Sequence, residues 1–177
     1  MNAIRNTAGV ALGLLFAGCM YPGRATREQR LATAAQESAR YCDGDTEETT
    51  QEVIKAVRDA QPLYVKINTG KRSSSSKSYL LGAKLLIEAR QGMTAQSLER
   101  TLRCHQARRV MEPDPAAELD PFSLANSWVD IQVQTDRSGF VVLLRGQTPE
   151  ESQLIDSRAQ EFINSRGPEY ISHLDRH

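Results

Sequence analysis

Three cysteines and one histidine are the side chains of this sequence best suited to specific chemistry. Cys19 ends an apolar segment, Cys42 and Cys104 stand far apart in the chain, and His105 follows Cys104 directly. A thiol can be acylated, oxidised to a disulfide or bound to a metal. An imidazole can act as a base or a metal ligand near neutral pH. The elements that hold these four residues decide which chemistry is open to each.

Residues 1–18 have the pattern of a secretory signal peptide. Arg5 is their one charged side chain, and an uncharged run leads from it to Cys19. This run is shorter than the roughly 20 apolar residues that a membrane-spanning helix needs, and its basic start and short apolar centre are typical of a leader. Phe16 is bulky at the third position before Cys19, where an ordinary signal peptidase requires a small residue.

The run LFAGC at residues 15–19 resembles the lipobox of bacterial lipoproteins, with Phe16 at the position where leucine is usual. The resemblance implies that Cys19 is lipidated and becomes the first residue of the mature chain, anchored to a membrane of the bacterial cell envelope. Met20, in place of an aspartate, favours the outer membrane facing the periplasm. The alternative is that Cys19 is a plain thiol or one half of a disulfide.

Cys42 and Cys104 are the thiols that remain once Cys19 is acylated. An even number of cysteines in an oxidising compartment predicts a disulfide between them. That bridge would close a loop of about 60 residues, for which loop entropy gives about 4 kcal/mol of stability. A thiol metal site is the alternative, although the chain has no CxxC spacing and only three histidines.

The charge balance argues against a nucleic-acid partner. Lysine and arginine number 22, and aspartate and glutamate also number 22, so the chain has no net charge that would attract nucleic acid or anionic lipid. Aromatic residues make up 6% of the chain, which disfavours a stacking platform for bases.

The first half of the chain predicts a helix, a mixed segment and a strand. Good helix formers occupy residues 26–41, and an acidic, turn-rich stretch follows. Residues 53–67 mix helical and alternating apolar spacing. Four consecutive serines with flanking cations at residues 69–78 predict a flexible loop at a hairpin tip. From Tyr79 onward, alternation through Arg90 predicts a half-buried strand.

The second half predicts a helix, a hairpin and a final helix. Thr94 can cap a helix that runs to Met111 and places His105 on its apolar stripe. A loop holding Phe122 and Leu124 follows, then two strands with Gly139 between them. The second of these strands is apolar on both sides, which favours a central place in the sheet. A capping box at 148–151 begins the last helix.

These elements predict an α+β fold with a βαββα core and helices on one face of a small antiparallel or mixed sheet. The expected order places the strand after Gly139 between the other two, with residues 63–67 as a possible fourth, edge strand. The expected divisions are a signal peptide at 1–18, a lipid-anchored tether and N-terminal helix at 19–42, a single domain at 43–166 and a polar tail at 167–177.

Four further segments carry a resemblance over roughly residues 53–164. They are CHQAR at 104–108, DPF at 120–122, SWVDI at 127–131 and GFVVLLRG at 139–146. Together they resemble a group of bacterial envelope proteins with no known activity, and the order of elements is similar to ring-building modules of secretion-system lipoproteins. These resemblances imply an envelope domain and leave its biochemical activity open.

His105 is the one candidate for a speculative site, with Asp130 and Asp120 as possible partners. The alternative is a packed histidine bonded to backbone or to a carboxylate. The sequence holds no GxSxG, HExxH or glycine-rich phosphate loop, so no catalytic, metal or cofactor residue is assigned. We expect a non-catalytic binding or scaffolding module with an envelope-protein partner. A small periplasmic hydrolase or metal-binding protein centred on His105 is the rival.

Overall fold

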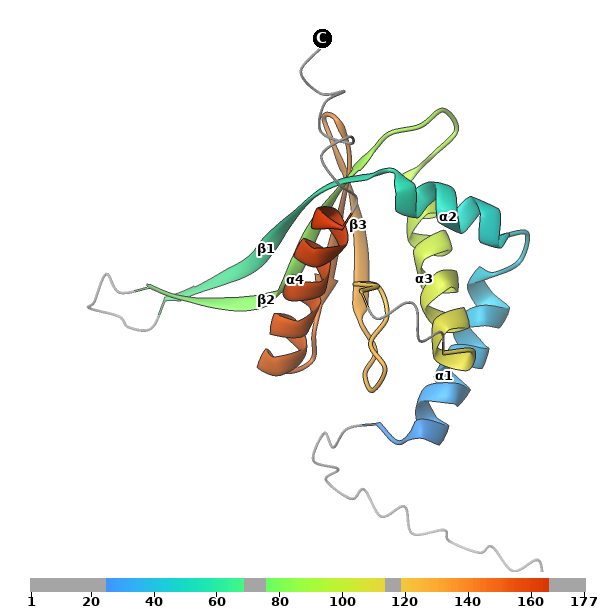
Figure 1. The fold of residues 1–177 in the computed structure, drawn as a ribbon, viewed down its shortest axis with the longest axis horizontal. Coiled ribbons are helices and arrows are strands. Elements are labelled where there is room, and N and C mark those ends of the chain that lie inside the picture. The colour runs from blue at the N-terminus through green and yellow to red at the C-terminus, as the bar shows by residue number, and fades with distance from the viewer. Residues whose placement is uncertain (1–24, 69–75, 114–118, 166–177) are drawn as a thin grey trace, which may run out of the picture.

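The computed structural model describes residues 25–68, 76–113 and 119–165 (Figure 1). The leader with Cys19, the serine-rich loop tip and the tail from residue 166 lie outside the described residues. The elements are α1 (Arg27–Tyr41), α2 (Glu47–Lys55), β1 (Val57–Asn68), β2 (Ser76–Glu88), α3 (Ala95–Met111), β3 (Asp130–Asp136), β4 (Gly139–Arg145) and α4 (Pro149–Asn164).

The four strands form one antiparallel sheet in the order β1-β2-β4-β3. Strand β4 is central because it is apolar on both sides, with Val142 and Leu144 fully buried on one side and Leu143 7% exposed on the other. Strand β1 pairs with β2 as the fourth, edge strand. The predicted α+β class and the predicted strand order are confirmed.

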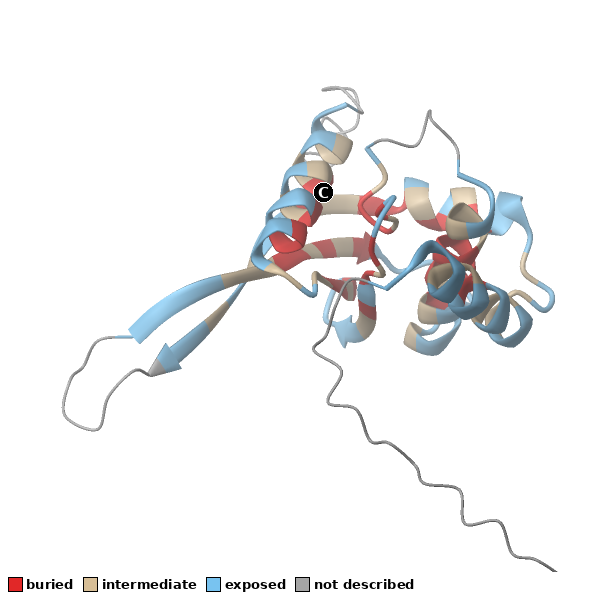
Figure 2. Cartoon of the chain, turned by 90° about the horizontal axis from the view of Figure 1, so that it is seen from below, coloured by how far each residue is buried: buried red, intermediate tan, exposed pale blue. Residues whose placement is uncertain are grey.

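The helices cover one face of this sheet. Alternate residues of β2, namely Ala83, Leu85 and Ile87, are buried on that face and form one cluster with Leu98 of α3 and Ile155 of α4. Helix α4 lies over β1 and β2, and α3 lies over β3, with α1 and α2 packed against the outer side of α3 (Figures 1 and 2). Figure 2 shows the buried residues concentrated between these helices and the sheet.

Threonine caps fix where the helices begin. The hydroxyl oxygens of Thr26, Thr94 and Thr148 each accept a hydrogen bond from a backbone N–H of the first helical turn, and each cap forms a reciprocal capping box. Pro149 occupies the first turn of α4, where no N–H is needed. The predicted starts of these three helices are therefore confirmed.

The acidic stretch after Cys42 differs from the prediction of a turn-rich segment. Thr46 caps α2, and its side chain accepts a hydrogen bond from the N–H of Thr49. Glu47 and Glu48 lie in the first turn of this helix, where the helix dipole favours negative charge. The acidic residues thus begin a helix, and the segment of mixed spacing divides after it, with α2 ending at Lys55 and β1 beginning at Val57.

A glycine shapes the turn between β3 and β4. Gly139 has φ +153°, and a Cβ at this position would clash with the backbone of Ile87 on β2. The close approach of β2 and β4 at this point therefore requires a residue without a side chain.

Candidate functional site

A disulfide joins the end of α1 to the middle of α3. Cys42 follows α1 directly, Cys104 is fully buried in α3, and their Cα atoms are 5.0 Å apart. The bridge closes a segment with a sequence separation of 62 residues. The predicted pairing of Cys42 with Cys104 is confirmed.

The same interface contains charged and aromatic contacts. The guanidinium of Arg103 on α3 lies 3.6 Å from a carboxylate oxygen of Glu37 and 2.9 Å from one of Glu99. It also lies 5.5 Å from the ring centroid of Tyr41, a cation–π geometry. Ala34 is the residue of α1 that is fully buried, so the helix depends on these contacts and on the disulfide to stay against α3.

His105 forms a buried pair with a carboxylate. Its Nε2 lies 2.7 Å from Oδ2 of Asp120, with the two side chains 2% and 10% exposed. The other oxygen of Asp120 accepts a hydrogen bond from the N–H of Phe122 at 2.9 Å. The Phe122 ring meets the imidazole edge-on at 6.2 Å between centroids. These contacts fasten the loop before β3 onto α3.

The second partner considered from the sequence, Asp130, is not at this site. Asp130 lies at the start of β3 with an exposed side chain, 3.7 Å from the guanidinium of Arg145 on the neighbouring strand. The two aspartates lie in different elements. Asp120 is in the loop before β3, which contacts α3, whereas Asp130 is the first residue of β3 and lies directly opposite Arg145 on β4. The speculative constellation of His105 with Asp130 is therefore corrected to His105 with Asp120.

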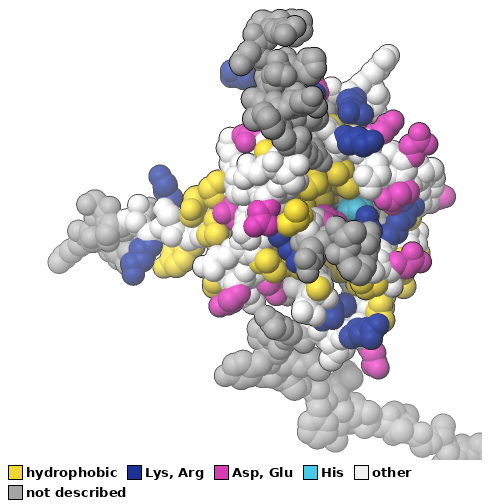
Figure 3. All heavy atoms as spheres, in the orientation of Figure 1, with side chains coloured by type: hydrophobic (Ala, Val, Ile, Leu, Met, Phe, Trp, Pro, Cys, Tyr) yellow, Lys and Arg dark blue, Asp and Glu magenta, His cyan; other side chains and the backbone are white. Residues whose placement is uncertain are grey.

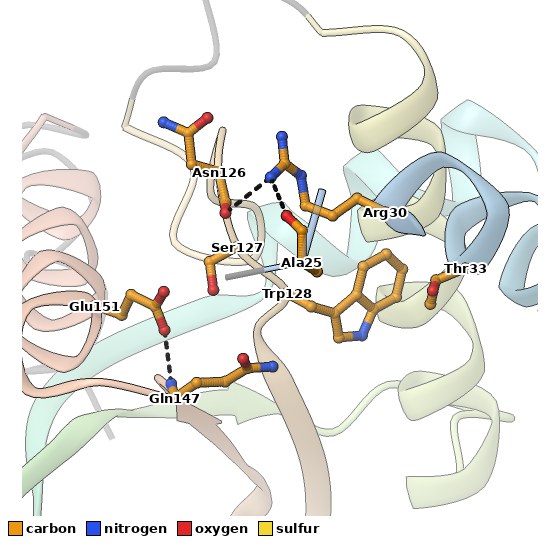
Figure 4. Close-up of a pocket in the computed structure, with 8 residues that line it drawn as sticks. All are labelled: Ala25, Arg30, Thr33, Asn126, Ser127, Trp128, Gln147 and Glu151. Atoms are coloured by element: carbon orange, nitrogen blue, oxygen red, sulfur yellow. Dashed lines mark hydrogen bonds between the residues drawn. The ribbon is translucent and has the colours of Figure 1, made fainter. Parts of the chain in front are cut away.

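A cavity of about 240 Å³ lies where α1, the loop before β3 and the start of α4 meet (Figure 4). Polar side chains outnumber apolar ones in its lining, which includes one indole, and no sequence motif marked these residues as a site. The lining residues are Ala25, Arg30, Thr33, Asn126, Ser127, Trp128, Gln147 and Glu151.

The charged groups of this cavity already have partners within the chain. Nη1 of Arg30 donates to the carbonyls of Ala25 and Asn126, and Oε2 of Glu151 accepts from the N–H of Gln147 (Figure 4). The volume is below the roughly 300–1,000 Å³ typical of small-molecule sites. We therefore interpret the cavity as a packing gap at the place where these three segments meet.

An exposed apolar ribbon is a further feature outside the core. We define the arm as residues 64–67 of β1 and 76–81 of β2, which project beyond the helices (Figures 1 and 2). Its side chains Tyr64, Ile67 and Tyr79 are 57%, 49% and 46% exposed. The apolar alternation at residues 63–67 predicted a strand, but it did not predict that the side chains of this strand would be exposed.

The carboxyl group of Asp156, on α4, has a shifted pKa. Burial raises the pKa of its carboxyl group above the usual value, and a hydrogen bond from Gln160 opposes this in part. Its Oδ1 atom has no hydrogen-bond partner among the described residues. The folded chain therefore holds this proton more tightly than the unfolded chain does.

We expect Asp156→Asn to raise the melting temperature near neutral pH. Because the folded-state pKa is raised, stability falls as the pH rises from the unfolded-state pKa, about 3.9, through the folded-state pKa. The advantage of the amide should shrink below that window. Thermal unfolding followed by circular dichroism at acidic and neutral pH measures this, with Asp136→Asn on the exposed β3–β4 turn as control. A lower melting temperature for Asp156→Asn at neutral pH would contradict the expectation.

No group of three or more His, Cys, Asp or Glu side chains in residues 25–68, 76–113 and 119–165 is placed to hold a metal ion. In the same part of the chain, no helix has both the length and the apolar character needed to cross a bilayer.

In comparisons with known proteins, the chain matches no family model, no curated protein and no solved structure. Its function must therefore be argued from its own residues.

Proposed function

We propose that this chain is a lipid-anchored, non-catalytic module of the bacterial cell envelope that binds or scaffolds another envelope component. The observation that carries the proposal is the apolar leader that ends at Cys19 in the run LFAGC. A thiol at that place is the acceptor for lipidation in bacterial lipoproteins, and acyl chains on it would hold the protein at the outer membrane, facing the periplasm.

Two features of the folded body support this proposal. The Cys42–Cys104 disulfide suits an oxidising compartment outside the cytosol. Helix α1 begins at Arg27, so residues 20–26 form the link between Cys19 and the first helix. Seven residues reach at most about 25 Å when fully extended. The domain would therefore sit close to the membrane surface.

The rival activity centred on His105 is not proposed. Nε2 of His105 is held by Asp120, and the side chain is 2% exposed. A general base must reach the proton that it removes, and a metal ligand must offer a free ring nitrogen. With the ring this deeply buried, a substrate or a metal ion in solvent does not reach it, and its contacts with Asp120 and Phe122 are those of a residue that holds a loop.

We expect Cys19→Ala to abolish acylation and release the protein from the membrane. Cells grown with an alkyne analogue of palmitate should label the wild-type chain and leave the variant unlabelled, and the variant should appear in the soluble periplasmic or culture fraction. Met20→Asp is the matched control, because it changes the neighbouring residue and keeps the thiol. It should retain the label and, in bacteria that sort by this residue, move to the inner membrane. Membrane association of Cys19→Ala equal to that of the wild type would refute the proposal.

A further inference from the structure

The arm is a two-stranded ribbon that leaves the sheet. Strands β1 and β2 pair out to Asn68 and Ser76, whereas β4 pairs with β2 only over Gly82–Glu88. Beyond Gly82, no third strand among the described residues flanks the ribbon. A ribbon of two strands is marginally stable in water when nothing packs against it. The arm therefore has the form of an element that is completed by binding.

Both faces of the arm are apolar. In an antiparallel pair, residues directly opposite each other point to the same face. Tyr64 lies opposite Leu80, and these two share one face. Val65 lies opposite Tyr79, and they share the other face with Ile67. A docked protein surface would cover one of these faces and leave the other in water. To cover both faces, a partner would have to surround the ribbon.

The arm carries two lysines and no acidic residue, and the sequence around it is also basic. The sequence from residue 60 to residue 87 contains no acidic residue and five basic ones, in a chain whose total charges balance. The basic residues are Lys66, Lys71, Arg72, Lys77 and Lys84. Lys66 and Lys77 lie on the described ribbon and are exposed, and Figure 3 shows dark blue and yellow side chains side by side along it. This local excess of positive charge disfavours pairing with the same arm of a second copy and favours an anionic partner.

We propose that the arm binds the anionic headgroup layer of a phospholipid bilayer. Tyrosine prefers the membrane–water interface, where its ring lies among apolar groups and its hydroxyl stays hydrated. Basic side chains next to such residues are attracted to anionic lipids. The interface is hydrated, so the unpaired edges of the ribbon keep water as a hydrogen-bond partner, which the hydrocarbon interior would deny them. This inference goes beyond the proposed function, because it requires a bilayer and not the acyl group on Cys19.

Hydrogen–deuterium exchange of the full chain tests the proposal. The protein is mixed with vesicles of phosphatidylcholine alone or of phosphatidylcholine with one third phosphatidylglycerol. Amides of the arm should exchange more slowly on the anionic vesicles only, while those of α3 and α4 remain unchanged. Lys66→Gln with Lys77→Gln should lower the affinity for anionic vesicles about 30-fold, measured as the lipid concentration that gives half of the full protection, because each cation contributes a several-fold gain in affinity on anionic lipid.

Matched variants separate charge from apolar contact. Tyr64→Ser with Tyr79→Ser should also lose the protection. Arg137→Glu, in the exposed turn between β3 and β4 at the end of the sheet opposite the arm, should keep it. Equal protection on both kinds of vesicle, or no protection on either, would overturn the proposal. Protection without vesicles that grows with protein concentration would also overturn it, in favour of self-association. The intact mass of the same sample shows whether Cys19 is acylated. A missing acyl group is therefore distinguished from an arm that does not bind the bilayer.

Discussion

Replacing both Cys42 and Cys104 by serine is expected to lower the free energy of unfolding by about 4 kcal/mol. The bridge closes a segment with a sequence separation of 62 residues, and removing it restores the conformational freedom of that long loop in the unfolded chain. Because domains of this size are stable by roughly 5–15 kcal/mol, the loss would remove a large part of the total. Urea unfolding of the oxidised wild type and of the double variant, followed by circular dichroism, measures the difference.

The effect should be concentrated at α1. Ala34 is the residue of this helix that is fully buried, and the ion pair of Arg103 with Glu37 is partly exposed and worth at most about 1 kcal/mol. We therefore expect α1 to exchange its amide hydrogens much faster in the double variant, while the sheet retains its protection.

Reduction of the wild-type protein provides the control for this prediction. A thiol reductant should move the wild-type unfolding curve to that of the double variant and leave the double variant unchanged. Coincident unfolding curves for the oxidised wild type and the double variant would show that the bridge adds nothing to stability.

The sequence predicted the parts of the fold that depend on local signals. Threonine caps, a proline in the first turn and strand alternation act over a few residues, so the starts of three helices and the buried face of β2 could be read directly. The central place of β4 followed from its apolar character on both sides. Helix α2 was missed because its polar, acidic first turn looks like a turn, and what makes it helical is the Thr46 cap and the burial of Val53.

The candidate sites depended on contacts that no local pattern encodes. Choosing between Asp120 and Asp130 as the partner of His105 required the path of a loop over α3, which the sequence does not specify. The exposure of Tyr64 and Tyr79 arises because β4 ends its pairing with β2 at Gly82, a tertiary feature. The pairing of Cys42 with Cys104 could be predicted because only two thiols remained to be paired.

Breaking the pair of His105 and Asp120 is expected to destabilise the fold by about 3 kcal/mol or more, because it leaves an uncompensated group in the interior. His105→Ala removes the partner of a carboxylate whose side chain is 10% exposed, and it also opens space beside Phe122. Asp120→Ala additionally removes the acceptor for the N–H of Phe122. Asp120→Asn preserves the shape and one acceptor, so we expect it to cost less than either alanine variant.

A double-mutant cycle assigns this loss to the pair itself. His105→Ala and Asp120→Ala share one interaction, so the double variant should be less destabilised than the sum of the two single variants, by an amount that measures their coupling. Asp130→Ala is the matched control, since that aspartate is exposed and its contact with Arg145 spans 3.7 Å; it should cost less than about 1 kcal/mol. If His105→Ala unfolds at the wild-type urea concentration, the imidazole does not hold the loop, and the case for a chemical role would reopen. If His105→Ala is destabilised and the cycle gives a clear coupling energy with Asp120, then His105 is the residue that fastens the loop before β3 to α3.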